Sequence, residues 1–161
     1  MQPIEFKPIG VIHTPFSKPE GAPIQPSHSA HAKGHIELLP EFRPGLSDLD
    51  GFSHIILIYH LHLSKNYKLS VKPFLDTKQR GLFSTRAPKR PNAIGLSVVR
   101  LINIEDNILN IEDVDMVDRT PLLDIKPFVP AFEEFENIRI GWLEGKAHKA
   151  RETSADDRFN E

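Results

Sequence analysis

Prolines set the strongest limit on how this chain can fold. Fourteen of them are spread over its 161 residues. A proline inside a helix removes a backbone hydrogen bond and clashes with the turn before it. We therefore expect helix only as short turns, one after Pro44, where proline suits a first helical position, and one at residues 131–137. The rest of the chain is left to short strands and loops.

The segment from Phe52 to Leu63 shows the clearest strand pattern. Its alternate residues form one continuous apolar face, made of Ile55, Leu57, Tyr59, Leu61 and Leu63. This alternation indicates a strand with one face packed on a core. Residues 94–104 and 108–114 form a second β-rich region, and the polar residues 105–107 between them predict a hairpin.

Further strands are predicted at residues 6–12, 35–39, 81–84 and 138–143. Many short strands broken by frequent turns are typical of a barrel or a sandwich. We predict a mainly β fold, a single small antiparallel β-barrel with a few short helices. The barrel domain is expected at residues 4–145. The almost wholly polar residues 146–161 are expected to form a frayed C-terminal tail.

Missing residue types and segments exclude several classes of protein. The chain has no cysteine, which excludes disulfides, thiolate zinc sites and a cysteine nucleophile. No apolar run reaches the roughly 18 residues of a membrane span. The N-terminus, MQPIEFKPIG, lacks the pattern of a secretory signal, so we expect a cytoplasmic protein. The eight histidines do not follow metal-site spacing, and no metal is expected.

Basic residues are concentrated in one part of an otherwise acidic chain. The formal net charge is −2, yet residues 65–100 contain nine basic residues and one acidic residue, a local charge of +8. Such a region can attract a polyanion such as nucleic acid. A solvated, lysine-rich loop is the alternative interpretation.

Within this region, residues 81–101 (GLFSTRAPKRPNAIGLSVVRL) interleave cations with prolines. The cations are Arg86, Lys89 and Arg90, and the prolines are Pro88 and Pro91. Because proline restricts its own backbone and that of the residue before it, the loop loses less entropy when it binds a ligand. This pattern predicts a stiff basic loop that binds an anion. A proline-rich turn with incidental charge is the alternative.

Residues 113–130 (DVDMVDRTPLLDIKPFVP) form a second candidate region. It begins with three crowded aspartates, Asp113, Asp115 and Asp118. A carboxylate cluster can balance a cationic ligand, such as a sulfonium or a metal ion, although aspartates also form turns. Further along, Asp124 and Lys126 are two residues apart and can pair on one face of an extended chain.

Taken in order, several segments resemble the TsaA/TrmO-like family, also called YaeB-like. They are IGVIHTPF (9–16), PIQP (23–26), GLSDLDGFSHIILIYHLH (45–62) and the two regions at 81–101 and 113–130. The resemblance implies a β-barrel methyltransferase that uses S-adenosylmethionine. It further implies methylation of N6-threonylcarbamoyladenosine at tRNA position 37, beside the anticodon, and a homodimer with the cofactor near the subunit interface.

The resemblance also implies roles for particular residues. Cofactor contacts fall on Pro23, Ile24, Gln25, Leu61, His62, Arg86, Leu96, Asp113, Val114 and Asp115. The basic residues Lys89 and Arg90, with Asn92 and Lys126, are expected to contact the anticodon arm of the tRNA. The acceptor nitrogen must lose a proton, and Asp118 and His62 are the candidate proton acceptors.

This chain departs from the family pattern at three positions. Ala93 stands where a proline is common, Arg119 where a glycine is common, and Ile24 where an arginine can occur. These departures bear on the choice of substrate more than on methyl transfer. Two other functions stay open, namely a non-catalytic RNA-binding β-barrel and a metal-dependent hydrolase that uses the histidines.

Overall fold

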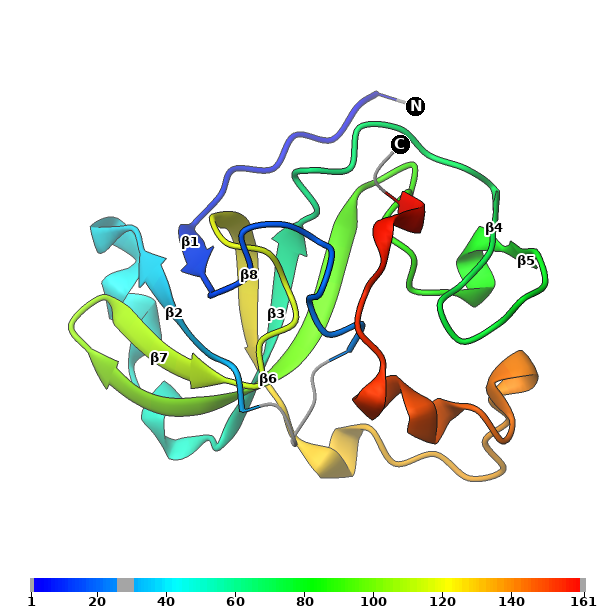
Figure 1. Ribbon diagram of the computed structural model, residues 1–161. Coiled ribbons are helices and arrows are strands. Elements are labelled where there is room, and N and C mark those ends of the chain that lie inside the picture. Colours follow the sequence, from blue (N-terminus) through cyan, green and yellow to red (C-terminus); the bar gives the residue numbers. More distant parts are fainter. Residues whose placement is uncertain (1, 26–30, 160–161) are drawn as a thin grey trace.

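Six antiparallel strands close into a barrel in a computed structural model that describes residues 2–25 and 31–159, without the side chains of residues 151 and 152. The strand order is β1-β2-β7-β6-β3-β8 (Figure 1). The strands are β1 (Gly10–His13), β2 (Lys33–Leu38), β3 (His54–His60), β6 (Ile94–Glu105), β7 (Ile108–Glu112) and β8 (Thr120–Pro127). The predicted antiparallel β-barrel is therefore confirmed.

Short 3-10 helices and a small second sheet make up the rest of the regular structure. Strands β4 (Ser70–Val71) and β5 (Arg80–Gly81) pair outside the barrel. The 3-10 helices in the described residues are η1 (Pro40–Leu46), η2 (Leu49–Gly51), η3 (Leu82–Ser84), η4 (Pro130–Phe132), η5 (Gly141–Leu143), η6 (Ala147–Glu152) and η7 (Asp157–Phe159). Helix η1 contains Pro44, as the proline pattern indicates. No helix of the described residues is long and apolar enough to cross a membrane.

The barrel core follows the predicted alternation. Ile55, Leu57 and Tyr59 of β3 are buried. They belong to one apolar core with inward-facing residues of β1, β2, β6, β7 and β8. The hairpin between β6 and β7 turns at Asp106, whose φ of 60° lies in the left-handed region that aspartate tolerates. Apolar alternation and a polar turn were therefore sufficient signals for these three strands.

Two strand predictions were wrong, and one strand of the barrel was not predicted. Residues 138–143 contain η5 in place of a strand, and residues 82–84 form η3. Strand β8, which pairs with β1 and β3 and closes the barrel, lies in the segment read as an aspartate-rich site. Its two prolines and two charged residues interrupt the apolar alternation, so the sequence pattern does not indicate a strand there.

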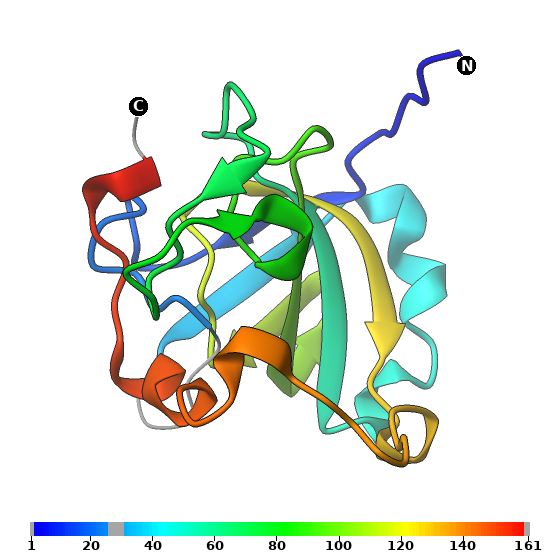
Figure 2. The ribbon, with the colours of Figure 1, turned by 90° about the vertical axis from the view of Figure 1, so that its right-hand side faces the viewer.

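The C-terminal segment, residues 153–159, is docked on the barrel and is not a frayed tail. Its backbone pairs with residues 21–24, where the Gly21 amide donates to the Ala155 carbonyl and the Ala155 amide donates to the Ala22 carbonyl, both at 2.8 Å. Phe159 packs edge-on against Phe74 at 5.1 Å. The red segment accordingly lies beside the blue one in Figures 1 and 2. Backbone pairing and one aromatic anchor compensate for the polar composition.

Candidate functional site

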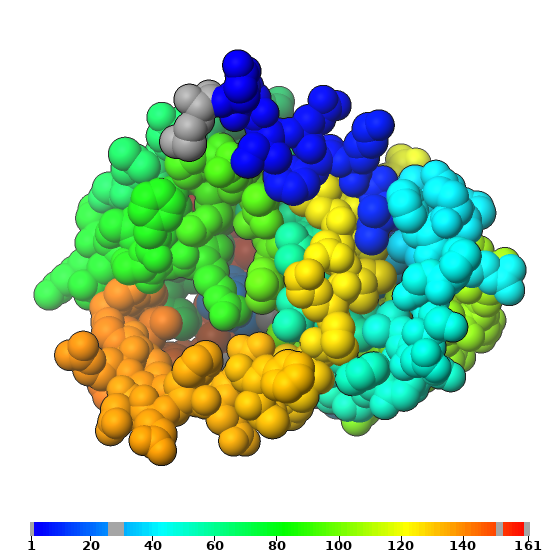
Figure 3. Space-filling view, turned by 180° about the vertical axis from the view of Figure 1, so that it is seen from behind, coloured from blue at the N-terminus to red at the C-terminus, as the bar shows by residue number. Residues whose placement is uncertain are grey.

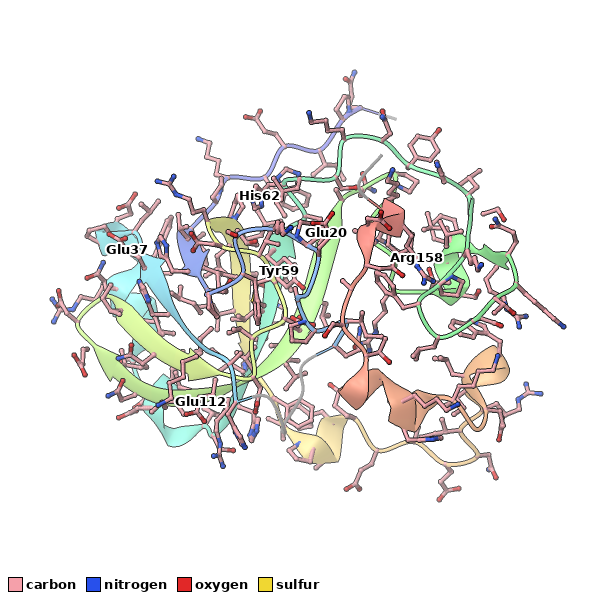
Figure 4. All side chains as sticks on the ribbon, viewed as in Figure 1. Glu20, Glu37, Tyr59, His62, Glu112 and Arg158 are labelled. Atoms are coloured by element: carbon pink, nitrogen blue, oxygen red, sulfur yellow. The ribbon has the colours of Figure 1, made fainter. Side chains whose placement is uncertain are left out.

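A cavity of about 600 Å³ opens at one end of the barrel, between the ends of β3 and β6, residues 19–25 and the C-terminal segment. Eight of the ten residues predicted to bind a cofactor line it: Pro23, Ile24, Gln25, Leu61, His62, Arg86, Leu96 and Asp115. Figure 4 shows Tyr59 and His62 at this end, whereas Glu37 and Glu112 lie on the far side of the barrel. Segments that are remote in sequence therefore converge on one volume.

Asp113 and Val114 are not among the described residues that line this cavity. Val114 packs in the barrel core. Asp113 is buried with a φ of 63°, and its carboxylate lies 3.9 Å from His31 Nδ1. Asp115 alone of these three lines the cavity: Val114 alternates away from it, and the left-handed backbone at Asp113 interrupts the extended geometry that would place Asp113 on the same side as Asp115.

Two residues that line the cavity, Tyr59 and Asp115, are connected through Ser97 by a chain of hydrogen bonds. The Tyr59 hydroxyl lies 3.0 Å from Ser97 Oγ, which in turn donates to Asp115 Oδ1 at 2.6 Å. Burial raises the pKa of Asp115 to about 6, against the opposing effects of the Ser97 hydrogen bond and the Arg86 charge. The pKa of Tyr59 is also raised, first by burial and then by Asp115. A carboxylate that is costly to ionise favours a cationic ligand beside it.

Gly95 makes room for this chain of polar groups. It pairs with Tyr59 across β3 and β6, and a Cβ atom built on Gly95 would lie 2.2 Å from Cε2 of the tyrosine ring. Any larger residue would displace the ring. Tyr59 was predicted only as a core residue and Ser97 was not singled out. The signal that could have found them is the shared inward parity of Gly95 and Ser97 in the family-like segment.

The basic loop is fixed by its own hydrogen bonds. Arg86 Nη1 donates to Gln25 Oε1 at 2.7 Å, which ties the loop to residues 19–25. Arg90 Nη1 donates to the Thr85 carbonyl at 2.9 Å, and its guanidinium lies 5.8 Å from the Phe83 ring. Arg90 therefore braces the loop in addition to the prolines, while the exposed Arg86 stands at the cavity.

The structure places the predicted RNA-contacting residues in different environments. Lys89 is 3% exposed, so the expectation that its ammonium group is offered to an RNA at the surface is wrong. Its side chain turns inward because the extended loop alternates around Pro88. Asn92 is exposed. Lys126 forms an ion pair with Asp124 on β8, with 2.7 Å between Nζ and Oδ2. Asn92 and Lys126 are both absent from the described residues that line the cavity. Of this group, Arg90 alone reaches it.

The two candidate proton acceptors also differ. His62 lines the cavity, and its Nδ1 is buried with no hydrogen-bond partner among the described residues. Burial, followed by the neighbouring His60, lowers the pKa of His62, so its imidazole is neutral near pH 7 and can accept a proton. His62 therefore brings a neutral imidazole to the wall of the cavity.

Asp118 is committed to the fold. Its Oδ1 accepts a hydrogen bond from the Thr14 amide at 3.1 Å and lies 3.4 Å from His13 Nδ1. Burial acts to raise the pKa of Asp118, but the amides of Thr14 and Arg119 outweigh it, and the net shift is downward. Asp118 does not line the cavity among the described residues. No cluster of metal-ligating side chains is found in the part of the chain that the structure describes.

A second cavity of about 520 Å³ adjoins the first. Six residues line both: Ile24, Gln25, Phe74, Thr85, Arg86 and Phe159. The outer wall of the second cavity comes from residues 83–87 and from residues 142–150. Figure 3 shows this face of the molecule hollowed between the green and orange segments.

Comparisons with known proteins agree on one family. The sequence model of the tRNA-methyltransferase O N-terminal domain matches residues 11–134. A probable S-adenosyl-L-methionine-binding protein of Pyrococcus abyssi is 53% identical over 154 residues, which are 96% of this chain and 84% of that protein. A mouse tRNA (adenine(37)-N6)-methyltransferase is 36% identical over 83% of this chain but only 33% of its own length.

A solved structure supports the same grouping. The crystal structure of TrmO from Pseudomonas aeruginosa superposes with a TM-score of 0.74 at 37% identity, covering 87% of this chain and 62% of that one. This chain thus spans less than two thirds of the solved TrmO chain and about a third of the mouse enzyme.

Proposed function

We infer that this chain, which belongs to the family of the tRNA-methyltransferase O N-terminal domain, is an S-adenosylmethionine-dependent methyltransferase acting on the N6 position of an adenosine in tRNA. The observation that carries this inference is the convergence of eight family-predicted cofactor residues on one cavity, among them the half-buried Asp115, whose carboxylate accepts a hydrogen bond from Ser97. The type of reaction is inferred from the named functions of the relatives, and the cavity is the proposed site of that reaction.

The residues present fit this cofactor. A cavity of about 600 Å³ lies within the range of small-molecule sites. It offers the cofactor's cationic centre the Asp115 carboxylate, and its carboxylate the Arg86 guanidinium, while Ile24, Leu61 and Leu96 provide apolar contact. When bound, S-adenosylmethionine supplies a methyl group already activated for displacement.

The protein's own contribution is alignment and proton removal. The Tyr59–Ser97–Asp115 chain fixes the carboxylate in position, and the Gln25–Arg86 hydrogen bond fixes the guanidinium. His62, which lines the cavity and is neutral near pH 7, would accept the proton that the acceptor nitrogen loses. Of the two candidates, His62 is therefore the proton acceptor in this proposal.

We further propose that the acceptor is N6-threonylcarbamoyladenosine at position 37, presented by the anticodon arm of a cytoplasmic tRNA. The mouse relative is named for adenine 37, which supports this position of the acceptor. The outer face of β6 supports a homodimer, because it exposes Ile94 and Leu96 at the cavity and Ile102 further along the strand.

The test is nucleoside mass spectrometry of threonylcarbamoyl-modified tRNA incubated with the protein and S-adenosylmethionine. We expect a product heavier by one methyl group, formed only when both are present. Calorimetry with the cofactor runs in parallel. Binding of tRNA without heat from the cofactor and without a methylated product would instead identify a non-catalytic RNA-binding barrel.

A further inference from the structure

The second cavity differs from the first in the side chains that line it. Among its described lining residues are four aromatic rings, Phe74, Phe83, Trp142 and Phe159, and a single charged residue, Arg86. No described residue of this lining is acidic, whereas Asp115 and Asp156 line the first cavity. An aromatic lining without carboxylates suits a flat, uncharged ring attached to an anionic group.

Three of these four rings carry an arginine. Arg80 lies over Trp142 at 5.5 Å, Arg90 near Phe83 at 5.8 Å, and Arg158 over Phe74 at 4.9 Å. Aromatic rings interleaved with guanidinium groups recur where proteins bind unpaired nucleotides, since bases stack on the rings and phosphates pair with the cations. Arg80 and Arg158 are themselves paired with Asp76 and Asp156, so these two arginines hold their rings in place. Arg90, whose described hydrogen bonds go to backbone carbonyls, is the one of the three that can pair with a phosphate.

Two rings have features that favour a stacking role. Phe83 is 74% exposed although it lines the cavity, so one side of a large apolar ring is left in water. Trp142 has its ring fixed, because Nε1 donates to the Ser84 carbonyl at 2.8 Å. A fixed ring and an exposed one at the same opening provide a surface that loses little entropy when a base stacks on it.

The two cavities meet at the hydrogen bond between Gln25 and Arg86, and both side chains line both cavities. A base in the second cavity would therefore share Gln25 and Arg86 with a molecule in the first cavity. Enzymes that modify a base inside RNA commonly turn it out of the stack into a pocket. The volume of about 520 Å³ suffices for a nucleoside.

We propose that the second cavity binds the acceptor adenosine, turned out of the RNA and stacked on Trp142 and Phe83, with Arg86 at the junction. This proposal rests on the proposed methyltransferase function and names its substrate subsite. One wall comes from residues 142–150 and Phe159, outside the matched family domain at 11–134. The C-terminal part of this chain is thereby assigned to substrate binding.

The first test uses fluorescence, because Trp142 is the single tryptophan of the chain. The protein is first saturated with S-adenosylhomocysteine and then titrated with N6-threonylcarbamoyladenosine 5′-monophosphate. We expect saturable quenching of the tryptophan emission, since the added base stacks on the ring. An emission that stays constant while the same protein methylates modified tRNA overturns the subsite.

The second test is kinetic. Trp142→Ala should raise the KM for modified tRNA by about 5- to 100-fold, the range that loss of one stacked base gives, with the Kd for S-adenosylmethionine within twofold of the parent. Trp142→Phe keeps a ring and should stay near the parent KM. The matched control is Phe135→Ala, an exposed ring that lines neither cavity, which should change nothing.

Together the two tests distinguish a failure of the proposed adenosine subsite from a failure of the proposed methyltransferase function. Saturable quenching without methyl transfer to any modified tRNA would support a nucleotide site and overturn the methyltransferase. Methyl transfer with a KM unchanged in Trp142→Ala would leave the methyltransferase standing and overturn the subsite.

Discussion

The barrel and the cover over its open end, residues 64–91 and 141–159, are stabilised in different ways. The barrel has continuous strand ladders around a core of thirteen buried residues. The cover has a two-residue strand pair, a cluster of Val71, Leu82 and Ala87 with Phe159, and individual polar contacts such as Asp76 with Arg80 and Lys146. The barrel therefore provides stability, and the cover adds Arg86 and the four aromatic rings of the second cavity to the ligand-facing groups at the end of the barrel, such as Asp115 and His62.

The comparison is tested most strongly by matched leucine truncations. Leu57→Ala in the barrel should lower the free energy of unfolding by about 2–5 kcal/mol, because it leaves a cavity in a closed core. Leu82→Ala in the cover should change tryptophan emission and ligand binding while the urea midpoint followed by circular dichroism moves much less. Equal shifts of that midpoint in both variants would show that barrel and cover unfold as one unit.

The second prediction concerns catalytic activity and not stability. Arg86→Ala should reduce kcat/KM by roughly 10- to 100-fold, the value of a hydrogen bond to a charged group, with an unchanged thermal midpoint. Arg100→Ala, an exposed arginine of β6 that is not among the described lining residues, is the control. Parent-like turnover on modified tRNA by Arg86→Ala would remove this residue from the site.

A smaller effect is the pH dependence of cofactor binding. The pKa of Asp115 is about 6, so its carboxylate is ionised above this pH and gains a proton as the pH falls through it. The Kd for S-adenosylmethionine should therefore rise below about pH 6, by up to about tenfold per pH unit. The rise should be weaker for S-adenosylhomocysteine, which lacks the sulfonium charge. Asp115→Asn should show no such dependence, and calorimetry across pH 5–8 measures it.

The smallest effect separates two neighbouring cations. Arg90→Ala should reduce the slope of log K for tRNA binding against log salt by about one, because one phosphate partner is lost. Lys89→Met should leave the slope unchanged, since Lys89 is buried. Salt titrations of filter binding compare the two, and a reduced slope in Lys89→Met would mean that this lysine reaches the RNA.

Local sequence patterns predicted the barrel better than the cover. Strands β3, β6 and β7 were predicted because alternation along the chain reports directly which face is buried. Strand β8 was missed because its two prolines and its two charged residues interrupt the apolar alternation. The docking of residues 153–159 was missed because their order depends on backbone pairing with residues 21–24, which composition does not record.

The site divides in the same way. The family-like motifs identified the residues around the first cavity, but not which side of the chain each presents, so Val114 and Lys89 were grouped with neighbours that point elsewhere. The second cavity left no motif, since its rings come from four separate segments around Phe74, Phe83, Trp142 and Phe159.

The sequence alone determined that this chain forms a small antiparallel barrel, because alternation and turn residues are local, and it marked the basic and aspartate-rich segments as candidates for a site. The tertiary structure decided which of those side chains share a cavity, that Asp115 is held by Ser97 and Tyr59, and that the C-terminal segment closes the site. Burial and charge balance depend on neighbours brought together by folding, and no local pattern specifies them.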